Sequence, residues 1–435
     1  MPDPRLEAVK LLMQIQKDSS YSSLAVTQAL KEIHFQDPRD TAFAVTLVYG
    51  VLENKLTLDY NISLYLSDKT ARLKSNVRNT LRVGAYQLLF LDKIPQSAAV
   101  NESVKITKAL GAKFATGLVN AVLRRIAENG LVLPETESIN KNLSIRHSVG
   151  IDIVDSVVKD YGKEKAESIF SAFTGRRPIY IRHNIHKCSE ACLIESLKSA
   201  GVVVDTTKIS GCFTVENTGD LTALEAFRKG FFYVQDMSSQ LCCALLDAKP
   251  GETVIDCCAA PGGKSFTLSQ NMKNEGKIIS CDIHSHKTEL IQKTAERLGI
   301  KNIETVCCDA RDLKNHYSGA DKVLCDVPCS GFGVIGRKPE IRYKRKDEFN
   351  TLPALQKEIL FSCAEMVRKG GTLIYSTCTL NKNENDSVCE AFLKEFDDFR
   401  ISDDDLYRGY TDRFLTLFPE NAGGDGFYIA KFIRG

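Results

Sequence analysis

Residues 254–266 read VIDCCAAPGGKSF, an apolar strand that runs through a turn of small residues into the start of a helix. Two phosphate-binding loops share this general form, and neither fits. A Walker A loop matches at GKS (263–265) but requires a glycine where Cys258 stands. A G-x-G-x-x-G loop fails because Gly262 and Gly263 are adjacent. The turn therefore predicts close approach of backbone to a ligand without a triphosphate or pyrophosphate.

From about residue 236 onward, short apolar strands alternate with helix-like stretches. The strands are TVIDCC, KIISCD, IETVCC, KVLCDV and TLIYST, at 253–258, 277–282, 303–308, 322–327 and 372–377. This alternation is typical of a parallel sheet with helices on both faces, which binds ligands beyond the carboxyl ends of its strands. A last strand, FYIAKFIR at 427–434, is expected to lie antiparallel at the edge of the sheet.

Two further domains are predicted ahead of that sheet. Apolar residues recur at helical spacing throughout the first 135 residues, in PRLEAVKLLMQI, YSSLAVTQALKEI (21–33), one long run at 39–66, VRNTLRVGAYQLLFL, SAAVNESVKITKAL and FATGLVNAVLRRIAE. Helical stretches then mix with short alternating ones such as RPIYIRHN and CFTVEN, which predicts a small α+β module. The predicted domains are therefore 1–135, 136–235 and 236–435.

The composition is that of an ordinary globular protein, with 43% hydrophobic and 26% charged residues and a net charge of +2. Its 15 cysteines stand in a long chain without a secretory signal, so we expect free thiols in a reducing cytoplasm. No uncharged run is long enough to predict a membrane span. No C-x-x-C pair is present to form a zinc site, and we expect no metal.

Three aspartates follow successive strands of the predicted sheet. Asp282 ends the second strand, where a carboxylate can accept the hydroxyl hydrogens of a ribose. Asp309 follows the third strand, within reach of an adenine amine, and Asp326 ends the fourth. A single aspartate at such a place is usually a cap or turn former. Three in register after a glycine loop predict an adenosine ligand without phosphates, of which S-adenosylmethionine is the common one.

Two cysteines end strands at the same expected edge, in DVPCSGFG (326–333) and IYSTC (374–378). A thiolate that adds to carbon 6 of a pyrimidine makes carbon 5 nucleophilic enough to accept a methyl group from a sulfonium, which is covalent catalysis. A free thiol is only about 3% thiolate at pH 7, so the attacking cysteine needs local activation. The residues alone leave open whether Cys329 or Cys378 attacks.

Several motifs resemble those of a known family. DCCAAPGGK, DVPCSGFG, YSTCT and VQDMSSQ (234–240) resemble the RNA cytosine-5 methyltransferases, while VRNTLRVGAYQLLF, IPQSAAVNESV and GLVNAVLRR resemble a NusB-type RNA-binding domain. The pairing is similar to the bacterial Sun/Fmu subfamily and covers essentially the whole chain. The family often has serine where Thr379 stands and threonine where Ser265 stands, and both departures keep a hydroxyl.

The resemblance implies a NusB-like helical domain, an RNA-recognition-like middle module and a Rossmann-like class I methyltransferase domain. It makes Cys378 the nucleophile, Cys329 the thiol that assists release of the product, and Asp326 the carboxyl group that contacts the base. It places S-adenosylmethionine against Asp282, Asp309, Asp326 and the loop residues Cys258, Ala259, Ala260, Pro261, Gly262, Gly263 and Lys264. It also implies a cytosine of 16S ribosomal RNA as substrate. A thiol reaches one face of that base only if the base leaves its stack, so we expect base flipping. We also expect a monomer.

Basic residues suggest where RNA is held. GRKPEIRYKRK (336–346) has six basic residues against one acid over 337–346, close to the Pro-Cys loop. We expect phosphate contacts and base stacking from Arg337, Lys338, Arg342, Tyr343, Lys344, Arg345 and Lys346. In the helical domain, further RNA affinity is expected from Arg72, Lys74, Arg78, Arg82, Arg124 and Arg125. The plainer interpretation of such charge runs is a solvated surface.

Four alternatives differ in testable ways. A zinc cytidine deaminase needs P-C-x-x-C, but Ser330, Gly331 and Phe332 follow Cys329. The hypothesis of an NTPase is disfavoured because the Walker A loop is incomplete. A non-catalytic RNA-binding or antitermination factor would not need both cysteines and all three acids. DNA cytosine methyltransferases attack with the cysteine of their Pro-Cys motif, which would favour Cys329. Within the RNA family, transfer RNA is the second candidate substrate.

Overall fold

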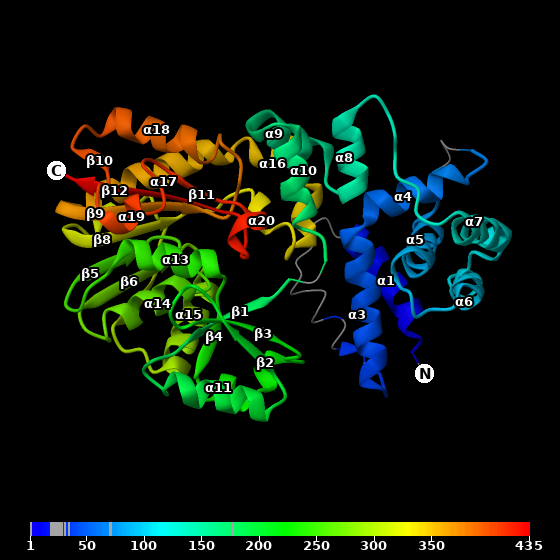
Figure 1. Ribbon diagram of the computed structural model, residues 1–435, viewed down its shortest axis with the longest axis horizontal. Helices are drawn as coiled ribbons and strands as arrows, with labels where there is room; N and C mark the ends of the chain where they lie inside the picture. Colours follow the sequence, from blue (N-terminus) through cyan, green and yellow to red (C-terminus); the bar gives the residue numbers. More distant parts are fainter. Residues whose placement is uncertain (1, 18–28, 30–31, 34, 69–71, 176) are drawn as a thin grey trace. The chain divides into compact units, whose positions relative to one another are not determined.

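The computed structural model describes residues 2–17, 29, 32–33, 35–68, 72–175 and 177–435 (Figure 1). The chain forms two compact units. We call Met1–Thr174 with Arg337–Lys346 the helical unit, and Gly175–Gly336 with Asp347–Gly435 the sheet unit. The helix expected at 21–33 lies mostly outside the described residues. Within the described ranges, every helix is too short or too polar to cross a lipid bilayer.

Amphipathic helices form the first part of the helical unit, as their apolar spacing predicts. They are α1 (Pro4–Lys17), α3 (Pro38–Glu53), α4 (Lys55–Leu64), α5 (Ser75–Phe90), α6 (Gln96–Ala109), η1 (Lys113–Ala115) and α7 (Thr116–Asn129). The single helix expected at 39–66 is divided into α3 and α4 at Asn54. The Asn54 side-chain amide donates to the carbonyl of Gly50 at 2.9 Å, which caps α3 where the chain changes direction.

Three more helices complete the helical unit: α8 (Ile139–His147), α9 (Ile151–Tyr161) and α10 (Lys163–Ser171). The segment 337–346, which contains η5 (Pro339–Tyr343), also belongs to it. The backbone N–H of Gly150 donates to the carbonyl of Arg342 at 2.6 Å, and the Tyr343 hydroxyl donates to the carbonyl of Leu52 at 2.6 Å. The predicted middle domain, 136–235, is thus divided between the two units, because α8 packs on α4 while α9 and α10 pack on α8.

The sheet unit begins with a small α+β layer. Its strands are β1 (Ile179–His183), β2 (Val203–Thr206), β3 (Cys212–Glu216) and β4 (Phe232–Val234), in the antiparallel order β2-β3-β1-β4. The associated helices are α11 (Glu190–Ser199), η2 (Leu221–Ala223) and α12 (Glu225–Arg228). Alternate strand residues such as Ile181 and Phe213 are buried against Leu193 and Leu197 of α11.

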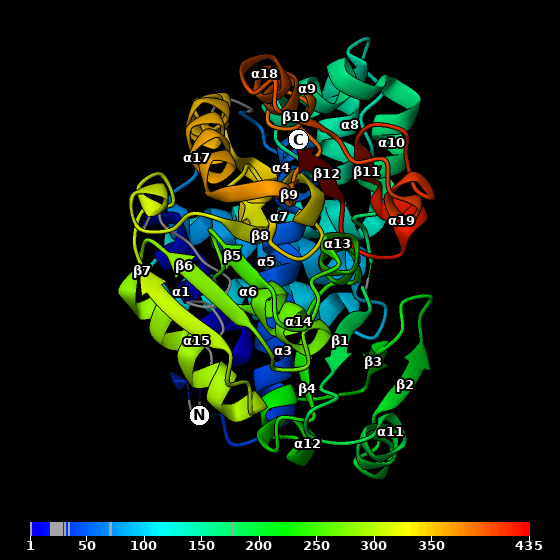
Figure 2. The same ribbon diagram turned by 90° about the vertical axis from the view of Figure 1, so that its left-hand side faces the viewer.

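The large sheet has the order β10-β12-β9-β8-β5-β6-β7, with β11 also paired to β12 (Figure 2). Its strands are β5 (Thr253–Asp256), β6 (Lys277–Asp282), β7 (Ile303–Cys307), β8 (Ala320–Asp326), β9 (Val367–Thr377), β10 (Phe399–Ile401), β11 (Leu415–Leu417) and β12 (Phe427–Arg434). β5 to β9 are parallel, whereas β12 is antiparallel to β9 as predicted. The expected edge position of β12 is wrong, because β10 and β11 pair with it on the side away from β9.

Helices cover both faces of this sheet (Figures 1 and 2). One face carries α13 (Met237–Leu246), α14 (Gly263–Asn271) and α15 (Ser285–Leu298), and the other carries α17 (Leu352–Met366) and α18 (Asp386–Glu395). Strand residues alternate between the two cores, since Ile374 packs on the α13 side while Leu373 and Tyr375 pack on the α17 side. The remaining short elements are η3 (Leu313–Asn315), η4 (Phe332–Val334), α16 (Lys346–Phe349), α19 (Asp405–Arg408) and α20 (Pro419–Ala422).

Candidate active site

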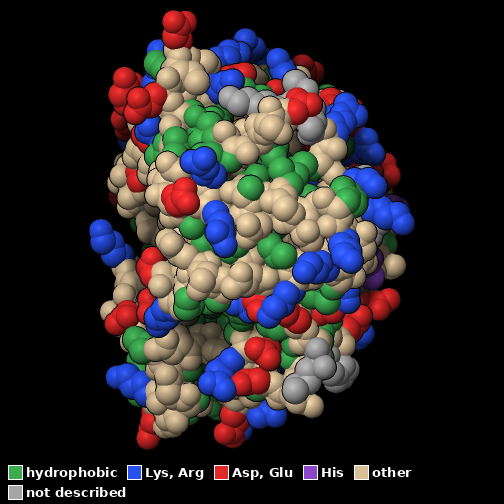
Figure 3. All heavy atoms as spheres, turned by 90° about the vertical axis from the view of Figure 1, so that its right-hand side faces the viewer, with side chains coloured by type: hydrophobic (Ala, Val, Ile, Leu, Met, Phe, Trp, Pro, Cys, Tyr) green, Lys and Arg blue, Asp and Glu red, His purple; other side chains and the backbone are tan. Residues whose placement is uncertain are grey.

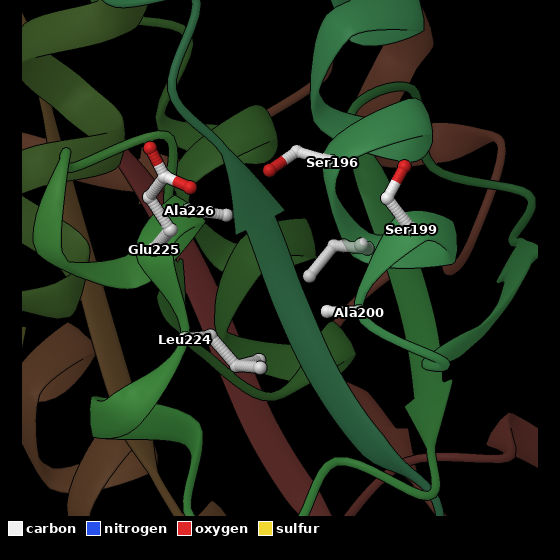
Figure 4. A pocket seen from close by; sticks show the side chains of 7 residues that line it. Ser196, Ser199, Ala200, Leu224, Glu225 and Ala226 are labelled. Carbon is white, nitrogen blue, oxygen red and sulfur yellow. The ribbon is translucent and has the colours of Figure 1, made fainter.

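The carboxyl ends of four neighbouring parallel strands bring the predicted site residues to one edge of the sheet. β6, β5, β8 and β9 are adjacent in that order. Asp282 and Asp326 are the last residues of β6 and β8, and Cys378 follows β9 directly. A cavity of about 350 Å³ elsewhere in the unit, between α11 and the turn at 224–226, contains no thiol or strand-end acid (Figure 4). The strand ends are therefore the candidate active site.

The loop after β5 turns sharply at Gly262, whose φ of 101° lies in the left-handed region that favours glycine. A Cβ there would come within 2.4 Å of the Phe266 ring, so the ring packs on the bare backbone. The N–H of Ala259 donates to the carbonyl of Cys281 at 2.7 Å, which ties the loop to the end of β6. As a result α14 begins at Gly263, beside the strand ends.

The two outer acids differ in how they are held. The Asp282 carboxylate is buried, and its Oδ1 accepts a hydrogen bond from the backbone N–H of His284 at 3.0 Å and lies 3.6 Å from the Lys287 ammonium, which leaves Oδ2 for ribose hydroxyls. Asp309 is held by the Arg311 guanidinium at 2.7 Å, and hydrogen bonds from Arg311 lower the pKa of the Asp309 carboxyl. Asp282 beside the glycine turn fits the adenosine part of S-adenosylmethionine.

Asp326 forms a close ion pair within this site. The Lys264 ammonium donates to Asp326 Oδ2 at 2.6 Å, and the Ser376 hydroxyl donates to Asp326 Oδ1 at 2.8 Å. Burial lowers the pKa of Lys264, but the charge and hydrogen bond of Asp326, together with the neighbouring Cys242 and Cys243, outweigh burial and hold that pKa above its ordinary value. A fixed positive donor and a carboxylate acceptor thus lie side by side at the end of β8.

The two cysteines meet across the ends of β8 and β9. Cys329 Sγ lies 3.3 Å from Cys378 Sγ, and both residues are partly exposed. The hydrogen bond to Cys378, followed by burial, raises the pKa of Cys329 well above its ordinary value. Cys329 is therefore a neutral thiol at physiological pH. The N–H of Gly333 donates to the carbonyl of Cys378 at 3.0 Å and joins the two loops.

A buried carboxylate, Glu384, holds both cysteine loops in place. Glu384 Oε2 accepts the backbone N–H of Ser330 at 2.8 Å and the side-chain amide of Gln356 at 2.9 Å. The Gln356 amide also donates to the carbonyl of Pro328 at 3.0 Å, beside Cys329. Glu384 Oε1 accepts the amide of Asn381 at 2.9 Å, on the loop that follows Cys378. One side chain with no exposed surface thus fixes the separation of the two thiols.

Comparison with known proteins agrees with this site. Residues 243–433 match the family model described as "16S rRNA methyltransferase RsmB/F", and residues 2–128 match the NusB family. The chain is 35% identical over 438 residues to a probable ribosomal RNA small subunit methyltransferase B of Bacillus subtilis, covering 98% of this chain and 97% of that protein. It is 33% identical over 447 residues to a protein of the same name from Synechocystis, covering 99% of each.

The chain belongs to the RsmB/F family of 16S rRNA methyltransferases. The crystal structure of PH0851 has the same fold over 100% of this chain and 99% of its own, with a TM-score of 0.82 and 26% identity. The predicted NusB-like N-terminal domain and Rossmann-like methyltransferase domain are confirmed. S-adenosylmethionine is the methyl donor of RsmB/F enzymes, in agreement with the acids and the glycine turn.

Sequence reasoning missed several residues of this RsmB/F site. Glu384, Gln356 and Ser376 gave no signal, because each is one polar residue in or beside an apolar segment. Ile283 follows Asp282 and is 57% exposed, so it offers an apolar surface next to the expected ribose. The sequence clue to Ile283 was its position directly after the strand-end acid Asp282.

The structure corrects part of the predicted RNA surface of this RsmB/F protein. Arg342 is 4% exposed, and its guanidinium donates to the carbonyls of His147 at 2.9 Å and Phe173 at 3.2 Å. The Lys55 ammonium covers the Tyr343 ring at 3.5 Å from its centroid. Both residues are thus engaged inside the helical unit, where their hydrogen bonds satisfy backbone groups. Lys338, Arg345 and Lys346 are exposed, and Arg337 and Lys344 are partly exposed.

Proposed function

We propose that this protein methylates carbon 5 of a cytosine in 16S ribosomal RNA, with S-adenosylmethionine as donor and a covalent bond between Cys378 and carbon 6 of the base. The observation that carries the proposal is the meeting of two thiols, 3.3 Å apart, beside the Lys264–Asp326 pair. A methyltransferase acting on an exposed amine or hydroxyl needs no such thiol pair. A pyrimidine carbon requires one nucleophile and one group to assist its departure.

The ion pair supports recognition of cytosine. The Asp326 carboxylate accepts a hydrogen bond from the exocyclic amine of cytosine, whereas uracil presents a carbonyl oxygen at that place. The Lys264 ammonium donates to ring nitrogen 3 and withdraws electrons from carbon 6, which makes addition of a thiolate easier. Because each group holds the other at 2.6 Å, both are in position before the base arrives.

The Cys378 thiol first loses its proton to water, and the resulting thiolate adds to carbon 6. The electron pair displaced to carbon 5 takes the methyl group. The bound donor supplies that methyl from its sulfonium. Carbon 5 then bears one hydrogen and the new methyl group. Cys329, a neutral thiol, gives its proton to the departing Cys378 sulfur, and the Cys329 thiolate takes the carbon-5 proton. The ring double bond is restored, and both residues leave the cycle as thiols.

The position of the methyl group can be tested with RNA that carries tritium at carbon 5 of cytosine. Transfer to carbon 5 releases the tritium into water, whereas transfer to a ring nitrogen, the amine or a ribose leaves it on the RNA. We expect release from unmethylated 16S ribosomal RNA in proportion to the methyl groups incorporated. Methyl incorporation without tritium release would contradict the proposal. Tritium release from transfer RNA but not from 16S ribosomal RNA would mean that the substrate is transfer RNA.

A further inference from the structure

The surface formed by α5, η1, α6 and α7 in the helical unit has an unusual charge distribution. Residues 69–91 contain five basic residues and no acid, and residues 103–127 also contain five basic residues and no acid. Acids make up 55 of the 435 residues of the chain, so both stretches depart from its average. Lys and Arg side chains are spread over the face that includes α6 and α7 (Figure 3).

Some of these cations serve the fold and are not available to a ligand. The Arg82 guanidinium forms an ion pair with Asp59 at 2.7 Å, and Arg78 donates to the carbonyl of Leu73 at 2.9 Å. Arg82 is buried, so its predicted RNA contact is not kept, whereas Arg78 is partly exposed. Arg72, Lys74, Lys108, Lys113, Arg124 and Arg125 remain exposed. Arg72, Lys74 and Lys113 lie where α5 begins and where α6 turns into α7, while Arg124 and Arg125 lie near the end of α7.

A phenylalanine stands in the middle of these cations. Phe114 lies in η1, between α6 and α7, and is 71% exposed. The residues on both sides of this turn, Ala112 and Ala115, are almost fully buried, so the backbone is anchored while the ring points outward. The Lys74 ammonium lies 5.1 Å from the centroid of the Phe114 ring.

The position of the ring relative to α5 is fixed by a local contact. The Asn76 side-chain amide donates to the carbonyl of Leu110 at 3.1 Å, which joins the first turn of α5 to the end of α6. Phe114 is also isolated, since no other large hydrophobic residue is strongly exposed in the described parts of α5, α6 and α7. A protein partner would need a broader apolar patch than one ring. A lone aromatic ring among cations matches the way single-stranded nucleic acids are bound.

We propose that Arg72, Lys74, Lys113 and Phe114, here called the Phe114 patch, bind a single-stranded segment of the RNA substrate. One base stacks on the Phe114 ring, and the three cations contact the phosphates on either side of it. The patch recognises no base edge, so it adds affinity without choosing the cytosine. This inference rests on the proposed function for the identity of the RNA, but RNA binding at the patch requires no methyl transfer.

Binding of a fluorescein-labelled oligouridylate of about 12 nucleotides to the full-length protein, without methyl donor, tests the patch. We expect Phe114→Ala to raise Kd about 10-fold and Phe114→Tyr to keep Kd within about 2-fold, because tyrosine retains the stacking face. The double variant Lys74→Glu with Lys113→Glu should weaken binding and reduce the slope of log Kd against log salt by about 0.7 for each phosphate that the protein no longer neutralises.

Matched controls lie outside the patch. Tyr410→Ala removes an aromatic ring that is 50% exposed in the sheet unit, and Lys163→Glu reverses an exposed charge in α10. Both should bind the oligonucleotide like the wild type. If Phe114→Ala binds normally, or if the controls lose as much affinity as the patch variants, the proposal is overturned. Weaker binding in the charge-reversal variant alone would also overturn the stacking role of Phe114.

Ultraviolet cross-linking gives an independent readout. Trypsin cleaves after Lys113 and Arg124, so the peptide that begins with Phe114 ends at Arg124. We expect this peptide to carry uridine after irradiation of the complex and to lack it in Phe114→Ala. Cross-links found only in other peptides would contradict the proposal. A protein that binds RNA through the patch but releases no tritium from labelled cytosine would refute the proposed chemistry and leave the patch intact.

Discussion

Two pairs of cysteines in the sheet unit have nearly the same separation but different surroundings. Cys329 Sγ and Cys378 Sγ are 3.3 Å apart, and Cys257 Sγ and Cys363 Sγ are 3.2 Å apart. The first pair is partly exposed beyond the strand ends, near Lys264 and Asp326. The second pair is sealed in the core between the sheet and α17. Proximity of two sulfur atoms therefore does not identify a reactive site by itself.

The surroundings decide what each pair can do. Burial, together with the neighbouring Cys325, raises the pKa of Cys363, and the hydrogen bond to Cys363 raises the pKa of Cys257, so both remain thiols among apolar side chains. The Cys329–Cys378 pair has solvent access and the buried carboxylate of Glu384, which sets the spacing of its loops. A thiol reacts only where a substrate can reach it and where charge can be stabilised.

The largest effect is expected from the exposed pair. Cys378→Ala should lower methyl transfer by about 10³-fold or more, because the covalent route is removed. Cys329→Ala should leave the attack intact and accumulate a protein–RNA adduct, visible on a denaturing gel. Cys363→Ala is the matched control and should turn over normally. An adduct in Cys378→Ala but not in Cys329→Ala would reverse the two roles.

The next effect concerns the residue that spaces the exposed thiols. Glu384→Gln replaces an acceptor of three N–H groups by an amide that also donates, so at least one buried donor is left without its partner. We expect kcat to fall about 10- to 100-fold through misplacement of the thiols, while the Kd for the methyl donor stays unchanged. Steady-state kinetics and calorimetry separate these quantities.

Glu390→Gln serves as the control for that variant, because Glu390 lies in α18, the helix that follows Glu384, and pairs with the exposed Arg413. It should behave like the wild type. If Glu384→Gln keeps its kcat, the carboxylate does not position the thiols. A weaker Kd for the donor would indicate a general disturbance of the sheet unit.

Alkylation should distinguish the two cysteine pairs by their solvent access and by the protonation state of their thiols. At pH 7.5, iodoacetamide should label Cys378 before Cys329, since the raised pKa of Cys329 keeps it protonated. Labelling of Cys329 should increase only as the pH rises above 9.0, the ordinary thiol value. Cys257 and Cys363 should stay unlabelled until the protein unfolds. Peptide-resolved mass spectrometry measures each site, with the exposed Cys192 and Cys307 as references for access.

Early labelling of Cys257 or Cys363 in the native protein would show that the core pair is accessible, and would remove the basis of the comparison. Labelling of Cys329 ahead of Cys378 at pH 7.5 would show that Cys329 is the more acidic thiol. That result would favour Cys329 as the nucleophile.

The smallest effect is expected from the core pair. Cys363→Ala removes a fully buried sulfur and should cost about 1–2 kcal/mol of unfolding free energy, the usual cost of a small cavity. Chemical denaturation measures this decrease, and methyl transfer should remain at the wild-type level. Loss of methyl transfer in Cys363→Ala, with the fold intact by circular dichroism, would mean that the core pair takes part in the reaction.

Much of the site was predictable because it follows from local sequence. Asp282, Asp326, Cys329 and Cys378 stand at or just after the ends of apolar runs, and a parallel sheet brings such ends together. The division of the long helix at 39–66 and the inner position of β12 were not predictable in the same way. Capping by Asn54 and pairing by the three-residue strands β10 and β11 leave weak patterns.

The two basic regions show the same limit. The segment 337–346 and the stretches around Phe114 look alike as charge runs. Only their contacts distinguish Arg342, bound to backbone carbonyls inside the helical unit, from Lys74, exposed beside an aromatic ring. Charge in a sequence indicates what a region can bind, but burial determines which of its cations are available.

The amino-acid sequence by itself determined the class of sheet, the order of its strands along the chain, the glycine turn and the chemistry of the two thiols, because periodicity and residue type are local properties. Tertiary structure decided the spacing of those thiols, through three hydrogen bonds to Glu384 from segments that are distant in sequence or on the neighbouring loop. It also decided which cysteine pair is sealed and which is open. Long-range packing sets these features, and no single segment encodes them.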